Sequence, residues 1–88
     1  MTWTIEFTPS ARRDIKKLGS EPARRIGAAL NDKIAKLADP RSIGAGLSGD
    51  WRGHWRWRIG NYRVVAKIED DKVLILVVRV AHRSDVYD

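Results

Sequence analysis

Basic side chains are concentrated in one stretch of this chain. Between Trp51 and Ile68 the sequence contains five arginine or lysine residues and no acidic residue. Guanidinium groups bind phosphate oxygens in a bidentate manner and keep their charge at neutral pH. The stretch is therefore suited to binding a phosphate-rich anion. Its basic residues are Arg52, Arg56, Arg58, Arg63 and Lys67.

The same stretch has the pattern of a β-hairpin. Apolar and basic residues alternate up to Ile59, as in a half-buried strand, and Gly60-Asn61 is a two-residue turn sequence. A two-residue loop places Ile59 opposite Tyr62 and Arg58 opposite Arg63, with both arginines on one face. Because like charges directly across a strand pair are destabilising, we expect an anion to bind there.

Length, charge and composition limit the possible classes of protein. The 88 residues are expected to form one domain, and 43% hydrophobic content is sufficient for a core. The net charge of +6 favours a polyanionic partner such as nucleic acid, the ribosome or an acidic protein. The absence of cysteine excludes disulfides and thiolate metal sites and fits a reducing cytoplasm. No secretion signal is visible, and the longest apolar run, Val73 to Val78, is too short to span a membrane.

The remaining sequence predicts the elements that must position the basic hairpin. Residues 2–8 alternate as a strand, Thr8-Pro9 is a helix start, and Gly19 ends that helix. A second helix is expected from Ser20 until Asp39-Pro40, and residues 41–50 are expected to form a flexible glycine-containing loop. Strands are predicted over residues 51–59, 62–68 and 73–80.

This β-α-α-β-β-β order predicts an α+β fold. We expect an antiparallel sheet of about four strands, with the two helices packed as a hairpin on one face. The opposite face would then be free to carry the arginines.

Two motifs resemble those of a known family. The segment from Trp55 to Val65 contains W-R-x-R-x-G-x-Y-R, and the segment from Leu76 to Tyr87 contains R-V-x-H-R-x-x-V-Y. Together they resemble the RelE/ParE toxin superfamily, and in particular its RelE-like branch. The resemblance extends over residues 1–88 and implies a single toxin domain with a microbial-RNase-like fold.

The resemblance also implies an activity. RelE-like members are toxins of type II toxin–antitoxin systems that cleave messenger RNA in the decoding site of the ribosome and so inhibit translation. The expected enzyme is a cytoplasmic, metal-independent endoribonuclease without a cofactor. Its implied partners are the ribosome with its RNA, messenger RNA and a cognate antitoxin, through which the complex would bind operator DNA.

Cleavage through the 2′-hydroxyl needs a base, an acid and cations that stabilise charge on phosphorus. By motif position, Arg63 and Arg83 are the candidates for charge stabilisation. Arg58 matches a family position that is often lysine, but an arginine side chain keeps its proton too firmly to act as a general base, so Arg58 is expected to orient or stabilise. Histidine is a common proton carrier in enzymes, and Tyr87 matches the usual family participant, so we expect His82 and Tyr87 to exchange protons. Further phosphate contacts are expected from Arg56, Arg52 and Lys67.

Two other functions remain open at this stage. A ParE-type toxin of the same fold would inhibit DNA gyrase without cutting RNA, whereas a non-catalytic module would bind nucleic acid without cleaving it. The combination of His82, Arg83 and Tyr87 favours the nuclease, because a gyrase inhibitor has no need of acid–base groups.

Some residues of this sequence are expected to be structural. Arg79 interrupts an apolar strand and is expected to pair with an acid such as Asp85. His54 is expected to be structural or a general RNA contact. Three of the four tryptophans follow the apolar side of strands and are expected in the core, whereas Trp51, at a loop–strand junction, is a candidate for stacking on RNA. The core tryptophans are Trp3, Trp55 and Trp57.

Overall fold

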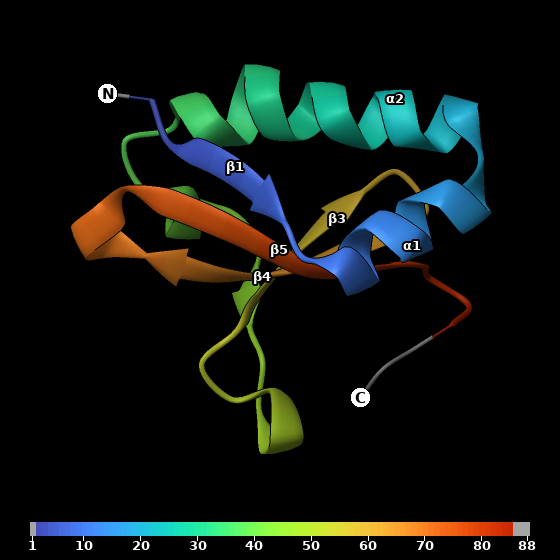
Figure 1. The fold of residues 1–88 in the computed structure, drawn as a ribbon. Helices are drawn as coiled ribbons and strands as arrows, with labels where there is room; N and C mark the ends of the chain where they lie inside the picture. Colours follow the sequence, from blue (N-terminus) through green and yellow to red (C-terminus); the bar gives the residue numbers. More distant parts are fainter. Residues whose placement is uncertain (1, 86–88) are drawn as a thin grey trace.

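The computed structural model, which describes residues 2–85, has two layers (Figure 1). Two helices lie on one face of the sheet, as the sequence predicted, and the sheet has five strands where about four were expected. The helices are α1 (Pro9–Leu18) and α2 (Ser20–Ala28), and α2 continues through a π-helical turn (Ala29–Lys33) and a 3-10 turn (Ile34–Lys36). The strands are β1 (Thr4–Phe7), β2 (Ala45–Gly46), β3 (Trp55–Ile59), β4 (Tyr62–Glu69) and β5 (Leu74–His82).

The strand order is β1-β5-β4-β3-β2. The predicted α+β class is confirmed, but the sheet is not antiparallel throughout, because β1 pairs with β5 in parallel from Thr4↔Leu74 to Phe7↔Val77. β1 and β5 come from opposite ends of the sequence and lie side by side at one edge of the sheet. The sheet also contains β2, a strand that the sequence did not predict.

The first helix begins where the sequence predicted. Thr8 is its N-cap, and the Thr8 hydroxyl accepts a hydrogen bond from the Ala11 N–H at 3.2 Å. Pro9 occupies the first turn, where its missing N–H costs nothing. Gly19, at φ 102°, separates α1 from α2.

The hydrophobic core lies between the helices and the sheet. Trp57 is 1% exposed and belongs to the same buried cluster as Ile26 of α2 and Leu30 of the π-helical turn. Its indole N–H donates to the Pro40 carbonyl at 3.1 Å, so this large side chain is buried with its polar atom satisfied. The core placement predicted for Trp3 and Trp57 is confirmed, whereas Trp55 is partly buried and packs against the core.

The segment predicted as a flexible loop is partly ordered against β3. Ala45–Gly46 forms β2, which pairs with Trp55 and Arg56. Gly44 precedes it at φ +87°, and a Cβ there would clash with the Arg56 carbonyl oxygen. Gly44 therefore allows a close backbone approach rather than flexibility.

The β2–β3 connection was also predicted differently. β3 begins at Trp55, not Trp51, and residues 47–54 form a loop that projects from the sheet on the side opposite the helices (Figure 1). Within residues 2–85, no helix has the length and apolar character needed to cross a membrane.

Candidate active site

A cavity of about 280 Å³ lies at the turn between β3 and β4. Three of its lining residues are predicted site arginines, brought together from β3, β4 and the segment after β5. The lining residues are Arg58, Gly60, Asn61, Tyr62, Arg63 and Arg83.

The β3–β4 turn creates the first half of this cavity. Gly60 adopts φ 60° as the first central residue of the two-residue turn, a conformation that suits glycine. The register pairs Ile59 with Tyr62 and Arg58 with Arg63, as the sequence predicted. Two guanidinium groups therefore extend from adjacent positions on the same face.

The segment after β5 supplies the third arginine. The Arg83 N–H donates to the Asn61 carbonyl at 2.7 Å, which fixes this segment against the β3–β4 turn. The strand pairing that leads to it, Tyr62↔His82 and Arg63↔Ala81, continues to the end of β5.

The electrostatics of the cavity favour an anion. None of its six lining residues is acidic, and within residues 2–85 the Arg58 and Arg83 side chains form no ion pair. Arg58 is exposed, and it faces Arg63 at a cost in stability that a bound phosphate would remove. The arrangement can hold a phosphate group from more than one side.

His82 lies beside this cavity without lining it. Its ring meets the Tyr62 ring edge-on, with centroids 5.5 Å apart and an interplanar angle of 84°. Its Nδ1 atom lies 2.8 Å from the Ser84 hydroxyl and accepts from the Ser84 N–H at 3.2 Å. The ring is therefore held on both sides, next to a residue that lines the cavity. Tyr87 lies outside the described residues.

Tyr62 is a site residue that sequence reasoning missed. It lines the cavity and contacts the His82 ring, yet it was given no site role, although it is the tyrosine of the W-R-x-R-x-G-x-Y-R motif. The signal that could identify it is the β4–β5 register, which pairs Tyr62 with His82.

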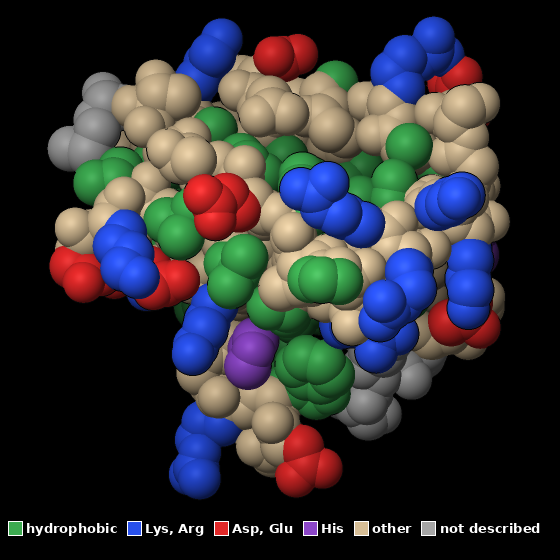
Figure 2. Space-filling model, viewed as in Figure 1, with side chains coloured by type: hydrophobic (Ala, Val, Ile, Leu, Met, Phe, Trp, Pro, Cys, Tyr) green, Lys and Arg blue, Asp and Glu red, His purple; other side chains and the backbone are tan. Residues whose placement is uncertain are grey.

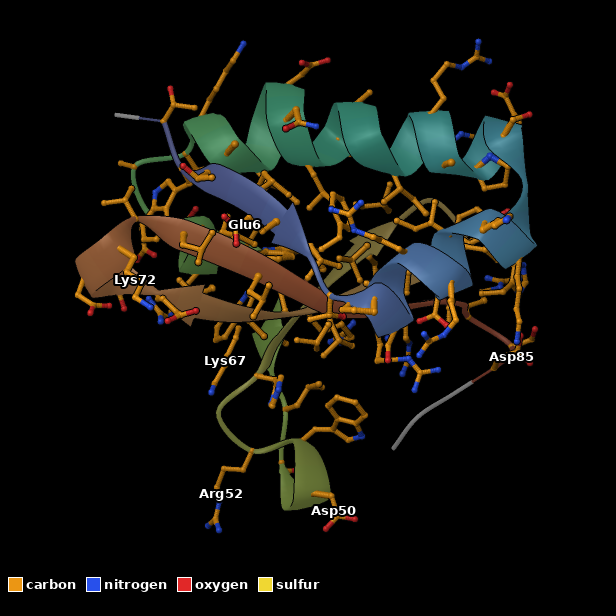
Figure 3. All side chains as sticks on the ribbon, in the orientation of Figure 1. Glu6, Asp50, Arg52, Lys67, Lys72 and Asp85 are labelled. Atoms are coloured by element: carbon orange, nitrogen blue, oxygen red, sulfur yellow. The ribbon has the colours of Figure 1, made fainter. Side chains whose placement is uncertain are left out.

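The three predicted RNA-contact residues lie away from the cavity. Arg56 is half-buried on β3 and lines a second groove, Lys67 is exposed on β4, and Arg52 is exposed on the projecting loop. The loop therefore carries Arg52 away from the β3 strand on which it was predicted (Figure 3).

Arg79 pairs with a different acid from the one predicted. Its Nε donates to Asp14 of α1 at 2.8 Å, and the Val80 N–H donates to the same carboxylate at 2.9 Å. Burial raises the pKa of Asp14, but these hydrogen bonds and the Arg79 charge outweigh it and leave the pKa below its ordinary value. The structural role expected of Arg79 is thus supported, with Asp14 rather than Asp85 as the partner.

A larger groove, of about 660 Å³, lies between the end of the α2 region and β3. β2 pairs with only the first two residues of β3, so the rest of this edge borders the groove. Its lining combines apolar side chains such as Ile43 with Lys33, Arg56 and Arg58. Arg58 and Gly60 line both cavities, so the two are adjacent.

A metal site is not evident in the described part of the chain. Within residues 2–85, no three His, Asp or Glu side chains are grouped in a way that could hold an ion.

Comparison with known proteins identifies the family. Residues 5–87 match the family described as the ParE toxin of the type II toxin–antitoxin system parDE. The chain is 34% identical to Toxin RelG of Mycobacterium tuberculosis, over 99% of this chain and 98% of that protein. It is 31% identical to Toxin RelE of the same organism, over 94% of this chain and 84% of that protein. A chain of the toxin–antitoxin complex RelBE2 from M. tuberculosis superposes with a TM-score of 0.86 and 28% identity, covering 97% of this chain and 95% of that one. The chain therefore belongs to the ParE toxin family of type II toxin–antitoxin systems, within the RelE/ParE toxin superfamily.

Proposed function

We propose that this toxin is a metal-independent endoribonuclease that cleaves messenger RNA in the decoding site of the ribosome and so inhibits translation in the cytoplasm. The observation that carries the proposal is the convergence of Arg58, Arg63 and Arg83 on one cavity. Phosphoryl transfer without a metal needs cations at the phosphate, and arginine provides a fixed charge with several donors. The resemblance to Toxin RelG and Toxin RelE over nearly the whole chain supports the same assignment.

The proposed reaction is attack of a ribose 2′-hydroxyl on the neighbouring phosphorus. The 2′-oxygen forms a bond to phosphorus as the bond to the 5′-oxygen breaks, which leaves a 2′,3′-cyclic phosphate and a 5′-hydroxyl. Arg63 and Arg83 stabilise the charge that develops on the phosphate oxygens, and Arg58 orients the group. His82 and Tyr87 take the 2′-hydroxyl proton and supply the proton to the leaving oxygen, in an order that the chemistry leaves open.

Contacts beyond the scissile phosphate are assigned to the other basic residues. Arg52, Arg56 and Lys67 extend along β3, β4 and the projecting loop, where they can meet neighbouring phosphates. Such contacts neutralise backbone charge and make binding depend strongly on salt.

The proposed protein partner is a cognate antitoxin, because the structural relative is a toxin–antitoxin complex. The larger groove is suited to it, since the exposed Ile43 provides an apolar contact while Lys33 and Arg56 attract acidic side chains. Because Arg58 lines both cavities, an acidic segment bound in the groove would compete with RNA for this residue. Binding of the complex to operator DNA is assigned to the antitoxin.

The second candidate is inhibition of DNA gyrase, which the ParE description of the family favours. A gyrase inhibitor would still use a basic surface, but it would not need His82 held beside an arginine-lined cavity. The arrangement of the site therefore favours the nuclease.

Cell-free translation with the purified toxin, followed by primer extension on the message, tests the proposal. We expect cuts within codons that appear with ribosomes and are absent from the same RNA without them. Addition of the co-expressed antitoxin should abolish them. An intact message together with halted DNA supercoiling would instead establish gyrase inhibition, and RNA binding without any cut would establish a non-catalytic module.

A further inference from the structure

The loop at residues 47–54 is an ordered projection. The Leu47 N–H donates to the His54 carbonyl at 3.1 Å, and the His54 N–H donates to the Trp51 carbonyl at 3.0 Å. A 3-10 turn, Gly49–Trp51, shapes its tip. The loop is thus held by its own hydrogen bonds while it extends away from the core (Figure 1).

Trp51 differs from the other tryptophans of this chain. Trp3 and Trp57 belong to the hydrophobic core and Trp55 packs against it, whereas Trp51 is outside this cluster. Trp51 is partly exposed. Trp51 is therefore not part of the packing between the helices and the sheet.

His54 fixes the position of Trp51. The two rings are in edge-on contact, with centroids 5.3 Å apart and an interplanar angle of 81°. The His54 Nδ1 atom also lies 3.2 Å from the Trp51 carbonyl oxygen. An aromatic ring that is held in place loses little entropy when a ligand stacks on it.

The loop is continuous with the basic face of the sheet. The β3–β4 pairing of Trp55 with Ala66 places His54 level with Lys67 when the register is extended by one residue. Lys67 points toward the loop, which carries Arg52 beyond it (Figure 3). In the space-filling view, basic and histidine side chains adjoin an apolar patch on this part of the molecule (Figure 2).

The same face leads to the arginine-lined cavity. Side-chain alternation along β3 places Arg56 and Arg58 on one face, and His54 directly precedes this strand. Four residues of extended chain, from His54 to Arg58, span about 13 Å. A strand of RNA held at the cavity by its phosphate would extend along this face toward Trp51.

We propose that Trp51 is a stacking platform for a nucleobase of single-stranded RNA, supported by His54 and flanked by Lys67 and Arg52. This inference rests on the proposed function, since it assigns a base-binding subsite to the same RNA. Every base offers a face for stacking and the neighbouring cations meet the backbone, so the subsite accepts RNA with little sequence preference. If the ligand of this loop were instead a partner protein, Trp51 would serve as an apolar anchor in that interface, and the test of RNA binding distinguishes these two ligands.

Binding of short single-stranded RNA by the purified toxin tests the platform. The RNA is 2′-O-methylated throughout, so that it cannot be cleaved, and a series of oligonucleotides each lacks one base. Trp51→Ala should weaken binding of the intact RNA roughly 5- to 150-fold, the range for loss of one base–aromatic stack. One abasic RNA should bind the wild type as weakly as intact RNA binds the variant, and Trp51→Ala should add no further loss with that RNA.

Two control variants accompany the test. Trp51→Phe retains a stacking ring and should keep most of the affinity, whereas Ser48→Ala changes an exposed residue of the same loop and should bind as the wild type does. Thermal unfolding of each variant checks that the fold is intact.

The inference is overturned by equal affinity of wild type and Trp51→Ala, by the same loss with every abasic RNA, or by no wild-type binding even at low salt. Loss of antitoxin affinity with RNA affinity unchanged would overturn it in favour of a protein contact. Its failure is separable from failure of the proposed function. If Trp51 is coupled to one base but no ribosome-dependent cleavage occurs, the proposed nuclease activity alone is refuted. If cleavage occurs without this coupling, the proposed stacking role of Trp51 alone is refuted.

Discussion

The N–H of Arg83 donates to the carbonyl of Asn61 at 2.7 Å, which joins the segment after β5 to the turn between β3 and β4. This one backbone hydrogen bond connects positions that are 22 residues apart in the sequence. Because Asn61 lies between Arg58 and Arg63 in the sequence, the bond brings Arg83 to the cavity that these two arginines line.

Removal of a cavity arginine should impair catalysis more than removal of an arginine elsewhere. We expect Arg58→Ala, Arg63→Ala and Arg83→Ala each to slow ribosome-dependent cleavage about 10²- to 10³-fold, as for loss of one group that stabilises transition-state charge. Arg13→Ala, on the exposed surface of α1, removes the same charge and is the control. Cleavage rates from primer extension measure the difference. Equal effects from all four variants would show that only the overall positive charge matters and that the cavity has no special role.

The proton carriers are tested by three substitutions. His82→Ala and Tyr87→Phe should each slow cleavage about 10²-fold or more, because each removes a group that is proposed to transfer a proton. Tyr62→Phe keeps the ring that contacts His82 and removes only the hydroxyl, so it tests whether Tyr62 positions His82 or itself transfers a proton; a loss smaller than that of His82→Ala is expected. Single-turnover rates on programmed ribosomes provide the measurement, and wild-type rates for both His82→Ala and Tyr87→Phe would refute the assignment.

A substitution in the larger groove should weaken antitoxin binding without changing the rate of RNA cleavage. Ile43 is an exposed apolar side chain of its lining, and Ile43→Asp places a negative charge where an acidic segment is proposed to bind. Antitoxin affinity should fall roughly tenfold or more, by loss of apolar contact and by like-charge repulsion. Titration calorimetry measures this change, with ribosome-dependent cleavage by the same variant as the control. Unchanged affinity would place the antitoxin elsewhere.

The Asp14–Arg79 pair should make stability depend on pH. The folded-state pKa of Asp14 is below its ordinary value of 3.8, so the unfolded chain binds a proton first as the pH falls. The stabilisation is present above pH 3.8 and is lost as the pH falls through the lower, folded-state value. Asp14→Asn should reduce the free energy of unfolding by about 1–3 kcal/mol at neutral pH. Denaturant unfolding at a series of pH values should show this difference shrinking in acid, and a difference independent of pH would contradict the electrostatic origin.

Two glycines should respond in opposite ways to alanine. Gly44→Ala should lower the free energy of unfolding by about 2–4 kcal/mol, because φ is +87° and the added Cβ clashes with the Arg56 carbonyl. Gly27→Ala, within α2 and with no atom within 4 Å of the added Cβ, should raise it by about 0.4–1 kcal/mol. Chemical denaturation of both variants checks this contrast, which would fail if Gly44→Ala were neutral.

The β3–β4 hairpin shows which features a local sequence pattern can predict and which it cannot. Alternation and the Gly60-Asn61 turn are enough to place Arg58 opposite Arg63, because in a two-residue hairpin the turn fixes the register. The same reasoning extended the strand back to Trp51, although β3 begins at Trp55. The error arose because apolar and basic residues continue into the projecting loop, where hydrogen bonds within the loop replace strand pairing.

Contacts between distant segments could not be read in this way. In β4 and β5, Val65 pairs with Arg79 and Ala66 pairs with Val77. One residue of β5 therefore has no pairing partner on β4, which is a β-bulge. The residue after this bulge meets Asp14 of α1, where the sequence suggested the nearer Asp85. Proximity in the chain favoured one acid, and packing of a helix against the sheet selected another.

The sequence by itself determined the two helical segments, the Thr8 cap of α1, the α+β class, the acid-free hairpin and the two motifs that indicate a RelE/ParE toxin. These depend on periodicity, turn chemistry and residue type, which act over a few positions. The tertiary structure decided that β1 lies parallel to β5, that Gly44 lies against Arg56, and that Arg83 joins the hairpin arginines. Each of these depends on which distant backbone groups find one another when the core closes, and no local pattern specifies that choice.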